Sequence, residues 1–146
     1  MKKRARGIKE TEETVERFLG EILKPHAPRI IGLSGNLGAG KTAFVKAIGK
    51  KAGVKDTVSS PTFVLLRLYR ISPRSVLGKR FSRLAHIDAY RIKPEELHVL
   101  GWDELVRDTK TLLVVEWPEM IQKKMPKDAR IVRMEIVDEE TRDITW

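Results

Sequence analysis

The chain has 146 residues, of which 41% are hydrophobic and 34% are charged, and it contains no cysteine. This length supports one globular domain with a sizeable core and excludes a nucleotide-binding domain joined to a second full domain. The lack of cysteine excludes a disulfide framework and a cysteine-based metal site, as in a reducing cytoplasm. The formal net charge of +9 favours a polyanionic partner.

The sequence shows no membrane-spanning or targeting segment. No stretch approaches the ~18 to 20 apolar residues of a membrane span. The basic residues 1–6 are not followed by the apolar segment of a secretory signal. We therefore expect a single cytoplasmic domain over residues 1–146 that does not contact a membrane.

The first predicted element is an amphipathic helix that begins at Thr11. Thr11 can act as the N-cap, and Glu12 and Glu13 suit the positive end of the helix dipole. One apolar face follows at helical spacing, made of Val15, Phe18, Leu19, Ile22 and Leu23. Pro25 and Pro28 end this helix, which we interpret as a packing element.

Residues 35–42, Gly-Asn-Leu-Gly-Ala-Gly-Lys-Thr, match the phosphate-binding pattern G-x-x-x-x-G-K-[ST] in full. The apolar run 29–34 before it is typical of a buried strand, and a helical pattern begins after it at Ala43. Glycines let successive backbone N–H groups surround a phosphate, and the helix N-terminus adds positive potential. Lys41 is expected to reach the β- and γ-phosphates, and the Thr42 hydroxyl is expected to ligate Mg²⁺. The loop therefore predicts binding of a nucleoside triphosphate.

A polar turn at Ser60-Pro61-Thr62-Phe63 leads into an alternating apolar run at residues 64–71. Such a segment is most often only a turn. In a nucleotide hydrolase, however, a threonine on a loop after the first helix can sense the γ-phosphate and Mg²⁺, as switch loops do. Both interpretations of Thr62 stay open at this point.

A basic hairpin loop is predicted at about residues 71–82, between the run 64–71 and a strand at about residues 81–87. The segment from Arg67 to Arg83 contains no acidic residue. This charge favours contact with RNA or an acidic protein face about as much as it favours a solvated loop. No RNA-binding motif with stacking aromatic residues accompanies it, so charge alone does not decide.

The strand at about residues 81–87 leads into the polar sequence His86-Ile87-Asp88-Ala89-Tyr90-Arg91. His86 and Asp88 share one face of a strand, at the end where α/β folds place their ligands. A lone aspartate there is often a turn former. Beside a phosphate loop, Asp88 becomes a candidate to position water or to hold the metal shell. Short helices are predicted from Pro94 to Gly101 and from Asp103.

Residues 111–116 predict a strand buried on both faces, because four consecutive apolar residues precede Glu116. A carboxylate at the C-terminal end of such a strand is how a Walker B segment presents an acid to Mg²⁺, so Glu116 is the predicted metal partner of Thr42. Trp117 either lines the nucleotide pocket or simply packs. Residues 129–137 alternate as a peripheral strand, followed by a turn.

Taken together, these segments resemble the TsaE family of small bacterial ATPases in tRNA threonylcarbamoyladenosine synthesis. The segments that match, in the family's order and rough spacing, are residues 35–44, 60–63, 86–91, 96–101 and 115–118. The resemblance implies an α/β fold: a single P-loop NTPase domain with a mixed central β-sheet flanked by helices. It also implies binding of ATP and Mg²⁺ and slow hydrolysis to ADP. This turnover would support TsaD and TsaB as they transfer threonylcarbamoyl to the adenosine beside the anticodon of tRNAs reading ANN codons. Contact with tRNA would be indirect or through that complex, and the chain alone is expected to be a monomer or weak oligomer.

The resemblance further implies residue roles. Thr42 and Glu116 would hold Mg²⁺, while Lys41, Asp88 and Thr62 would act in hydrolysis. In this alignment Thr11 takes a nucleotide-contacting position, and Arg142 that of an arginine closing over the nucleotide. The candidate nucleotide-binding residues are Thr11, Leu37, Gly38, Ala39, Gly40, Lys41, Thr42, Trp117 and Arg142.

Two other functions are compatible with a phosphate loop. A small-molecule P-loop kinase should have an arginine-rich lid and a pocket for the phosphate acceptor, and the basic loop at residues 71–82 can imitate such a lid. A non-enzymatic, nucleotide-dependent RNA-binding module should bind tRNA without partners, with an affinity that falls steeply with salt.

Overall fold

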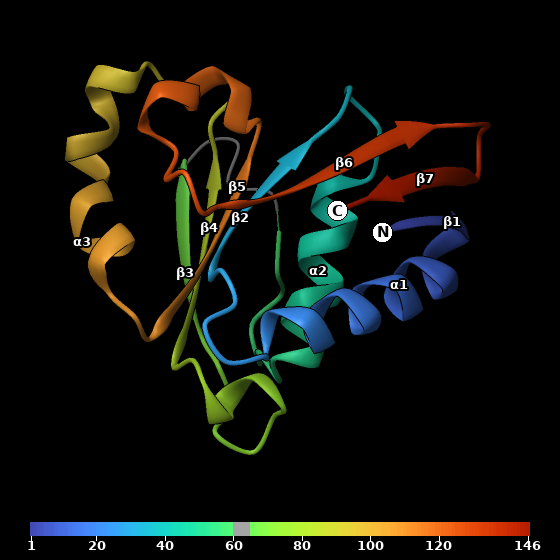
Figure 1. Ribbon diagram of the computed structural model, residues 1–146, viewed down its shortest axis with the longest axis horizontal. Helices are drawn as coiled ribbons and strands as arrows, with labels where there is room; N and C mark the ends of the chain where they lie inside the picture. Colours follow the sequence, from blue (N-terminus) through green and yellow to red (C-terminus); the bar gives the residue numbers. More distant parts are fainter. Residues whose placement is uncertain (60–64) are drawn as a thin grey trace.

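The fold is built on one mixed sheet (Figure 1). The computed structural model describes residues 1–59 and 65–146, and within them the sheet has seven strands in the order β1-β7-β6-β2-β5-β4-β3. The strands are β1 (Lys2–Arg6), β2 (Ile30–Ser34), β3 (Leu66–Arg70), β4 (Arg83–Asp88), β5 (Thr111–Glu116), β6 (Arg130–Ile136) and β7 (Thr141–Thr145). The predicted turn that contains Thr62 lies outside the described residues.

The centre of the sheet is parallel and its outer pairs are antiparallel. β2 lies between β5 and β6 and runs parallel to both, and β4 is parallel to β5. Every residue of β5 is buried, as expected for a strand covered on both faces. The C-terminal ends of β2, β4 and β5 therefore meet at one edge, where α/β folds place their ligands.

Helices cover both faces of the sheet (Figure 1). α1 (Gly7–Ile22) and α2 (Lys41–Lys51) lie on one face, where Phe18 and Phe44 pack edge to face with ring centroids 5.6 Å apart. α3 (Trp102–Arg107) covers the other face together with the 3₁₀ segments η2 (Pro94–Leu100) and η3 (Pro118–Lys124). A further 3₁₀ turn, η1 (Leu77–Lys79), lies in the β3–β4 connection. These layers confirm the predicted α/β class with a mixed sheet. No helix in the described part of the chain is long and apolar enough to cross a membrane.

The predicted start of the first helix at Thr11 is wrong. α1 begins at Gly7, which has a φ of 67° and lets the chain turn from β1 directly into the helix. The Thr11 hydroxyl donates to the Gly7 carbonyl at 2.9 Å from within the helix, so it does not act as an N-cap.

The sequence pattern gave no sign of β1, and it misplaced β6. In β1 only Ala5 is a buried apolar residue, and the strand is held instead by pairing with β7 and by ion pairs from Lys2 and Arg4 to Asp143 at 2.9 and 2.8 Å. β6 was predicted to be peripheral, but it is an interior strand between β2 and β7. The alternation of β6 was visible in the sequence, whereas its neighbours depend on long-range pairing.

Candidate functional site

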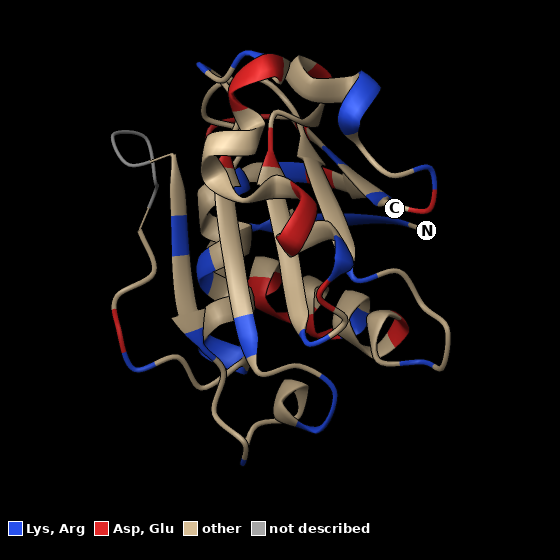
Figure 2. Ribbon diagram, turned by 90° about the vertical axis from the view of Figure 1, so that its left-hand side faces the viewer, with Lys and Arg blue, Asp and Glu red and all other residues tan. Residues whose placement is uncertain are grey.

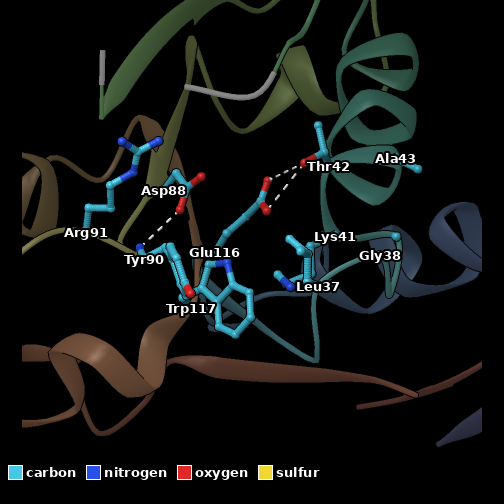
Figure 3. A pocket seen from close by; sticks show the side chains of 11 residues that line it. Leu37, Gly38, Lys41, Thr42, Ala43, Asp88, Tyr90, Arg91, Glu116 and Trp117 are labelled. Carbon is cyan, nitrogen blue, oxygen red and sulfur yellow. Dashed lines mark hydrogen bonds between the residues drawn. The ribbon is translucent and has the colours of Figure 1, made fainter. Parts of the chain in front are cut away.

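The glycine-rich loop lies between β2 and α2, as its pattern predicted. Gly40, with a φ of 98°, is the N-cap residue of α2. A Cβ on Gly35 would lie 2.4 Å from the Met134 carbonyl oxygen of β6, so only glycine fits there. Beside the loop is a pocket of about 530 Å³ (Figure 3). Its lining residues are Leu37, Gly38, Gly40, Lys41, Thr42, Ala43, Asp88, Tyr90, Arg91, Glu116 and Trp117.

Lys41 is a buried cation at the first position of α2. Its Nζ donates to the carbonyl oxygens of Gly35 and Asn36 at 2.6 and 3.1 Å and lies 3.8 Å from the centroid of the Trp117 ring. Burial lowers the pKa of Lys41 from its ordinary value, and the nearby carboxylates, Glu116 foremost, oppose that shift. The loop thus holds a positive charge beside its own backbone, and the same ammonium can turn toward a phosphate.

Thr42 and Glu116 join α2 to the end of β5. The Thr42 hydroxyl donates to the carboxylate of Glu116, with Oγ1 3.1 Å from Oε1 and 3.4 Å from Oε2 (Figure 3). Glu116 is only 3% exposed. The described residues contain no cluster of three or more His, Cys, Asp or Glu that would form an all-protein metal cage. Mg²⁺ is usually held by one or two carboxylates together with phosphate oxygens and water, so this hydroxyl and carboxylate suit Mg²⁺ bound with a nucleotide.

His86 is a functional candidate to which the sequence interpretation gave no role. It is fully buried, and its Nε2 lies 2.8 Å from Glu116 Oε1. Because a carboxylate only accepts hydrogen bonds, Nε2 carries the hydrogen. The other ring nitrogen, Nδ1, is buried without a hydrogen-bond partner among the described residues. The usable signal was the shared strand face of His86 and Asp88, which points both side chains toward α2.

Asp88 ends β4 directly opposite Glu116, its register partner on β5. It is 8% exposed, and its Oδ1 accepts the backbone N–H of Tyr90 at 3.1 Å (Figure 3). The ring of Tyr90 lies 4.8 Å from that of Trp117, centroid to centroid. Trp117 itself has a φ of 59°, in the left-handed region. Two carboxylates from adjacent strands thus lie beside the phosphate loop, and an aromatic pair lies at its mouth.

Some of the other predicted nucleotide-binding residues lie at the loop or the pocket, and others do not. Arg142, on β7, donates from Nη2 to the Gly38 carbonyl at 3.1 Å, so it lies against the phosphate loop. Leu37 is 86% exposed at the pocket, while Ala39, in the same loop, is buried and does not line the pocket.

Thr11 is not brought to the pocket. Its neighbour Glu12 pairs with Lys50 at 2.7 Å, close to the C-terminal end of α2. The phosphate loop lies at the opposite end of that helix, and Thr11 does not line the pocket beside it. The position of Thr11 therefore does not support the role expected for it, and Thr62 lies outside the described residues.

The site's residues lie within a stretch shared with known proteins. The family model described as "Threonylcarbamoyl adenosine biosynthesis protein TsaE" matches residues 7–144. A Rickettsia felis protein named "tRNA threonylcarbamoyladenosine biosynthesis protein TsaE" is 36% identical over 135 residues, which cover 90% of this chain and 72% of that protein. A Bacillus subtilis protein of the same name is 32% identical over 137 residues, 94% of this chain and 79% of that one. The crystal structure of Bacillus subtilis YdiB superimposes with a TM-score of 0.72 and 26% sequence identity, covering 99% of this chain and 82% of YdiB.

Proposed function

The chain belongs to the TsaE family, and from that premise we propose that it is an accessory ATPase for threonylcarbamoyladenosine synthesis in tRNA. It binds ATP with Mg²⁺ in the pocket beside α2 and hydrolyses ATP slowly to ADP and phosphate. One observation carries the hydrolytic part of this proposal. The loop lysine, the Thr42 hydroxyl and the carboxylates of Glu116 and Asp88 converge on a single pocket.

Each side chain has one task in this proposal. The backbone N–H groups of the loop and the Lys41 ammonium hold the β- and γ-phosphates. Thr42 and Glu116 hold Mg²⁺, which when bound neutralises charge on the phosphate oxygens. His86 fixes the orientation of the Glu116 carboxylate through its contact with Oε1. Asp88, at the end of the neighbouring strand, orients the attacking water.

We further propose that the ATPase acts with TsaD and TsaB. In that complex its turnover supports transfer of threonylcarbamoyl to the adenosine beside the anticodon of tRNAs reading ANN codons. The resemblance to the TsaE family implies these partners. Because tRNA is modified in the cytoplasm, we infer the same compartment for this protein.

The rival kinase function is disfavoured by the position of the basic loop. A lid must close over the phosphate loop, which follows the C-terminal end of β2. The connection 71–82 instead joins the end of antiparallel β3 to the start of β4, at the opposite edge of the sheet. A segment at that edge does not cover the pocket.

The decisive experiment compares the parent protein with Glu116→Gln in a reconstituted system. Phosphate release is measured alone and with purified TsaD and TsaB, and modified adenosine is measured on an unmodified tRNA transcript. We expect weak turnover alone, stimulation by the partners, and loss of both turnover and sustained modification in Glu116→Gln. If Glu116→Gln supports modification at the parent rate without ATP turnover, the proposal is overturned.

A further inference from the structure

The edge of the sheet opposite the nucleotide pocket carries a basic hollow. It has a volume of about 420 Å³. Four cationic side chains line it, Lys24, Lys79, Arg80 and Lys110, and His26 lies among them. Lys24 follows α1, Lys79 and Arg80 precede β4, and Lys110 precedes β5. Segments distant in sequence thus converge at the N-terminal ends of parallel strands. In Figure 2 this end of the sheet is at the bottom of the view, and Lys and Arg lie along its loops. We call these four cations the basic edge.

Arg80 forms a fixed part of the basic edge. Its guanidinium donates to the carbonyl oxygens of Ile22, Lys24 and Ala27, the last two at 3.1 and 2.6 Å. These carbonyls satisfy the donors and, as the end of α1, offset part of the charge, but they supply no formal negative charge. The charge of Arg80 therefore remains available to an anion at the surface.

A second arginine beneath this edge is held in the same way. Arg29 donates to the carbonyl oxygens of Leu105, Val106 and Thr111. Its pKa is lowered chiefly by burial; the charges of Asp108 and Asp128 oppose this shift, and the charge of Arg80 adds to it. Two neighbouring guanidiniums are thus anchored by main-chain oxygens.

In the part of the chain that the structure describes, carboxylates do not pair with the basic edge. The acidic residue beside it, Asp108, is already engaged by Arg83 at 2.6 Å and by the Thr111 hydroxyl at 2.5 Å. Within residues 1–59 and 65–146, no carboxylate forms an ion pair with any of the four cations of the basic edge. The edge therefore keeps a surplus of positive charge.

The composition of the hollow favours phosphate over an acidic protein. Its three lysines are exposed, and Val76 is the large exposed apolar side chain that lines it. Protein–protein interfaces are depleted of lysine and are centred on buried aromatic or apolar anchors. Lysines around a fixed arginine are instead suited to nucleic-acid phosphates, whose contacts position a partner without reading its sequence.

We propose that the basic edge binds the phosphodiester backbone of RNA. That the RNA is tRNA rests on the proposed function, whereas the phosphate contact rests on the charges described above. The basic edge is separated from the pocket by the length of β5, five residue steps or roughly 17 Å. RNA bound there leaves the nucleotide pocket open, so RNA and ATP bind at the same time.

The test uses the full chain with the triple substitution Lys24→Glu, Lys79→Glu and Lys110→Glu. The matched control is Lys9→Glu, Lys46→Glu and Lys123→Glu, which makes the same change in net charge at exposed lysines elsewhere. Binding of a fluorescent tRNA transcript is followed by anisotropy between 50 and 200 mM KCl. A Lys→Gln version of the first triple removes the charges without reversal, should the reversed protein not fold.

We expect the basic-edge triple to bind tRNA at least 10-fold more weakly than the parent at 50 mM KCl. The slope of log affinity against log salt should fall by about 2 to 3, because each phosphate contact contributes about 0.7 to 0.9. The control triple should stay close to the parent. Equal weakening in the two triples would overturn the proposal, as would a parent protein that does not bind tRNA. Parent-like tRNA binding by the basic-edge triple, with loss of TsaD–TsaB capture, would identify a protein partner instead. ATP binding and turnover, measured on the same samples, test the proposed function separately.

Discussion

His86 Nε2 lies 2.8 Å from Glu116 Oε1, between two neighbouring strands of the parallel sheet centre. The Thr42 hydroxyl approaches the same carboxylate from α2. A buried imidazole, a carboxylate and a hydroxyl therefore form one chain that ends beside the phosphate loop. Residues that hydrogen-bond to a metal-binding carboxylate set the orientation of that carboxylate and affect its affinity for the metal.

The first prediction concerns this positioning role. His86→Leu removes the hydrogen-bond donor to Glu116. We expect this variant to lower the affinity for Mg²⁺ and the rate of turnover by roughly 10- to 100-fold. His86→Gln can place an amide N–H near the position of Nε2 and should recover much of the loss. Binding of Mn²⁺ with ADP, followed by electron paramagnetic resonance, reports the metal site without turnover. If His86→Leu and parent bind Mn²⁺ equally, His86 serves packing alone.

The second prediction separates the two carboxylates. Asp88→Asn should bind ADP and Mg²⁺ like the parent but lose about 100-fold or more in turnover, because a positioned carboxylate assists the attacking water. Glu116→Gln should also lose turnover, but through weaker metal affinity that raised Mg²⁺ partly restores. Calorimetry with ADP and phosphate release across a Mg²⁺ series distinguish them. Parent-rate hydrolysis by both variants would show that other groups carry the reaction.

The third prediction concerns Arg142 and the phosphate loop. Arg142→Ala removes the hydrogen bond to the Gly38 carbonyl and loosens the loop from β7. We expect nucleotide affinity to fall roughly 2- to 10-fold, the value of about one hydrogen bond. Arg142→Lys keeps the charge but cannot also span the carbonyls of Asp138 and Glu139, which Arg142 now reaches. If affinity is unchanged in both variants, the contact has no part in binding.

Much of the site was predictable because its signals are local. The phosphate loop depends on glycines and one lysine in a fixed spacing, and the strand that ends on Glu116 depends on an apolar run. The His86–Glu116 contact was not predictable, since it requires β4 and β5 to be neighbours in register. β1 was not predicted for the same reason, because its pairing with β7 depends on Asp143 far along the chain. A capping residue at Thr11 was a sound local inference that β1 and Gly7 override.

The fourth prediction is a pH dependence of stability from Asp108. Hydrogen bonds from the Thr111 hydroxyl and Arg83, then from the Lys110 backbone, lower the pKa of Asp108 to about 2. Since the folded pKa lies below the unfolded value of about 3.9, the stabilisation is present above about pH 4 and is lost toward pH 2.

Asp108→Asn should therefore lower the free energy of unfolding by about 1 to 2 kcal/mol at pH 7, with the difference shrinking between pH 4 and pH 2. Urea unfolding at several pH values measures this. Asp56→Asn, at an exposed position, is the control and should track the parent. A constant difference across the range would mean that the Asp108 contacts do not depend on its charge.

The decisive measurement is ATP binding by Lys41→Ala, followed by titration calorimetry. The control is Lys46→Ala, an exposed lysine on the same helix α2. We expect Lys46→Ala to bind ATP like the parent. Lys41→Ala, correctly folded by circular dichroism, should give no measurable binding, because the β- and γ-phosphates lose their counter-charge. Parent-like ATP affinity in Lys41→Ala would show that the loop lysine does not hold the phosphates of ATP.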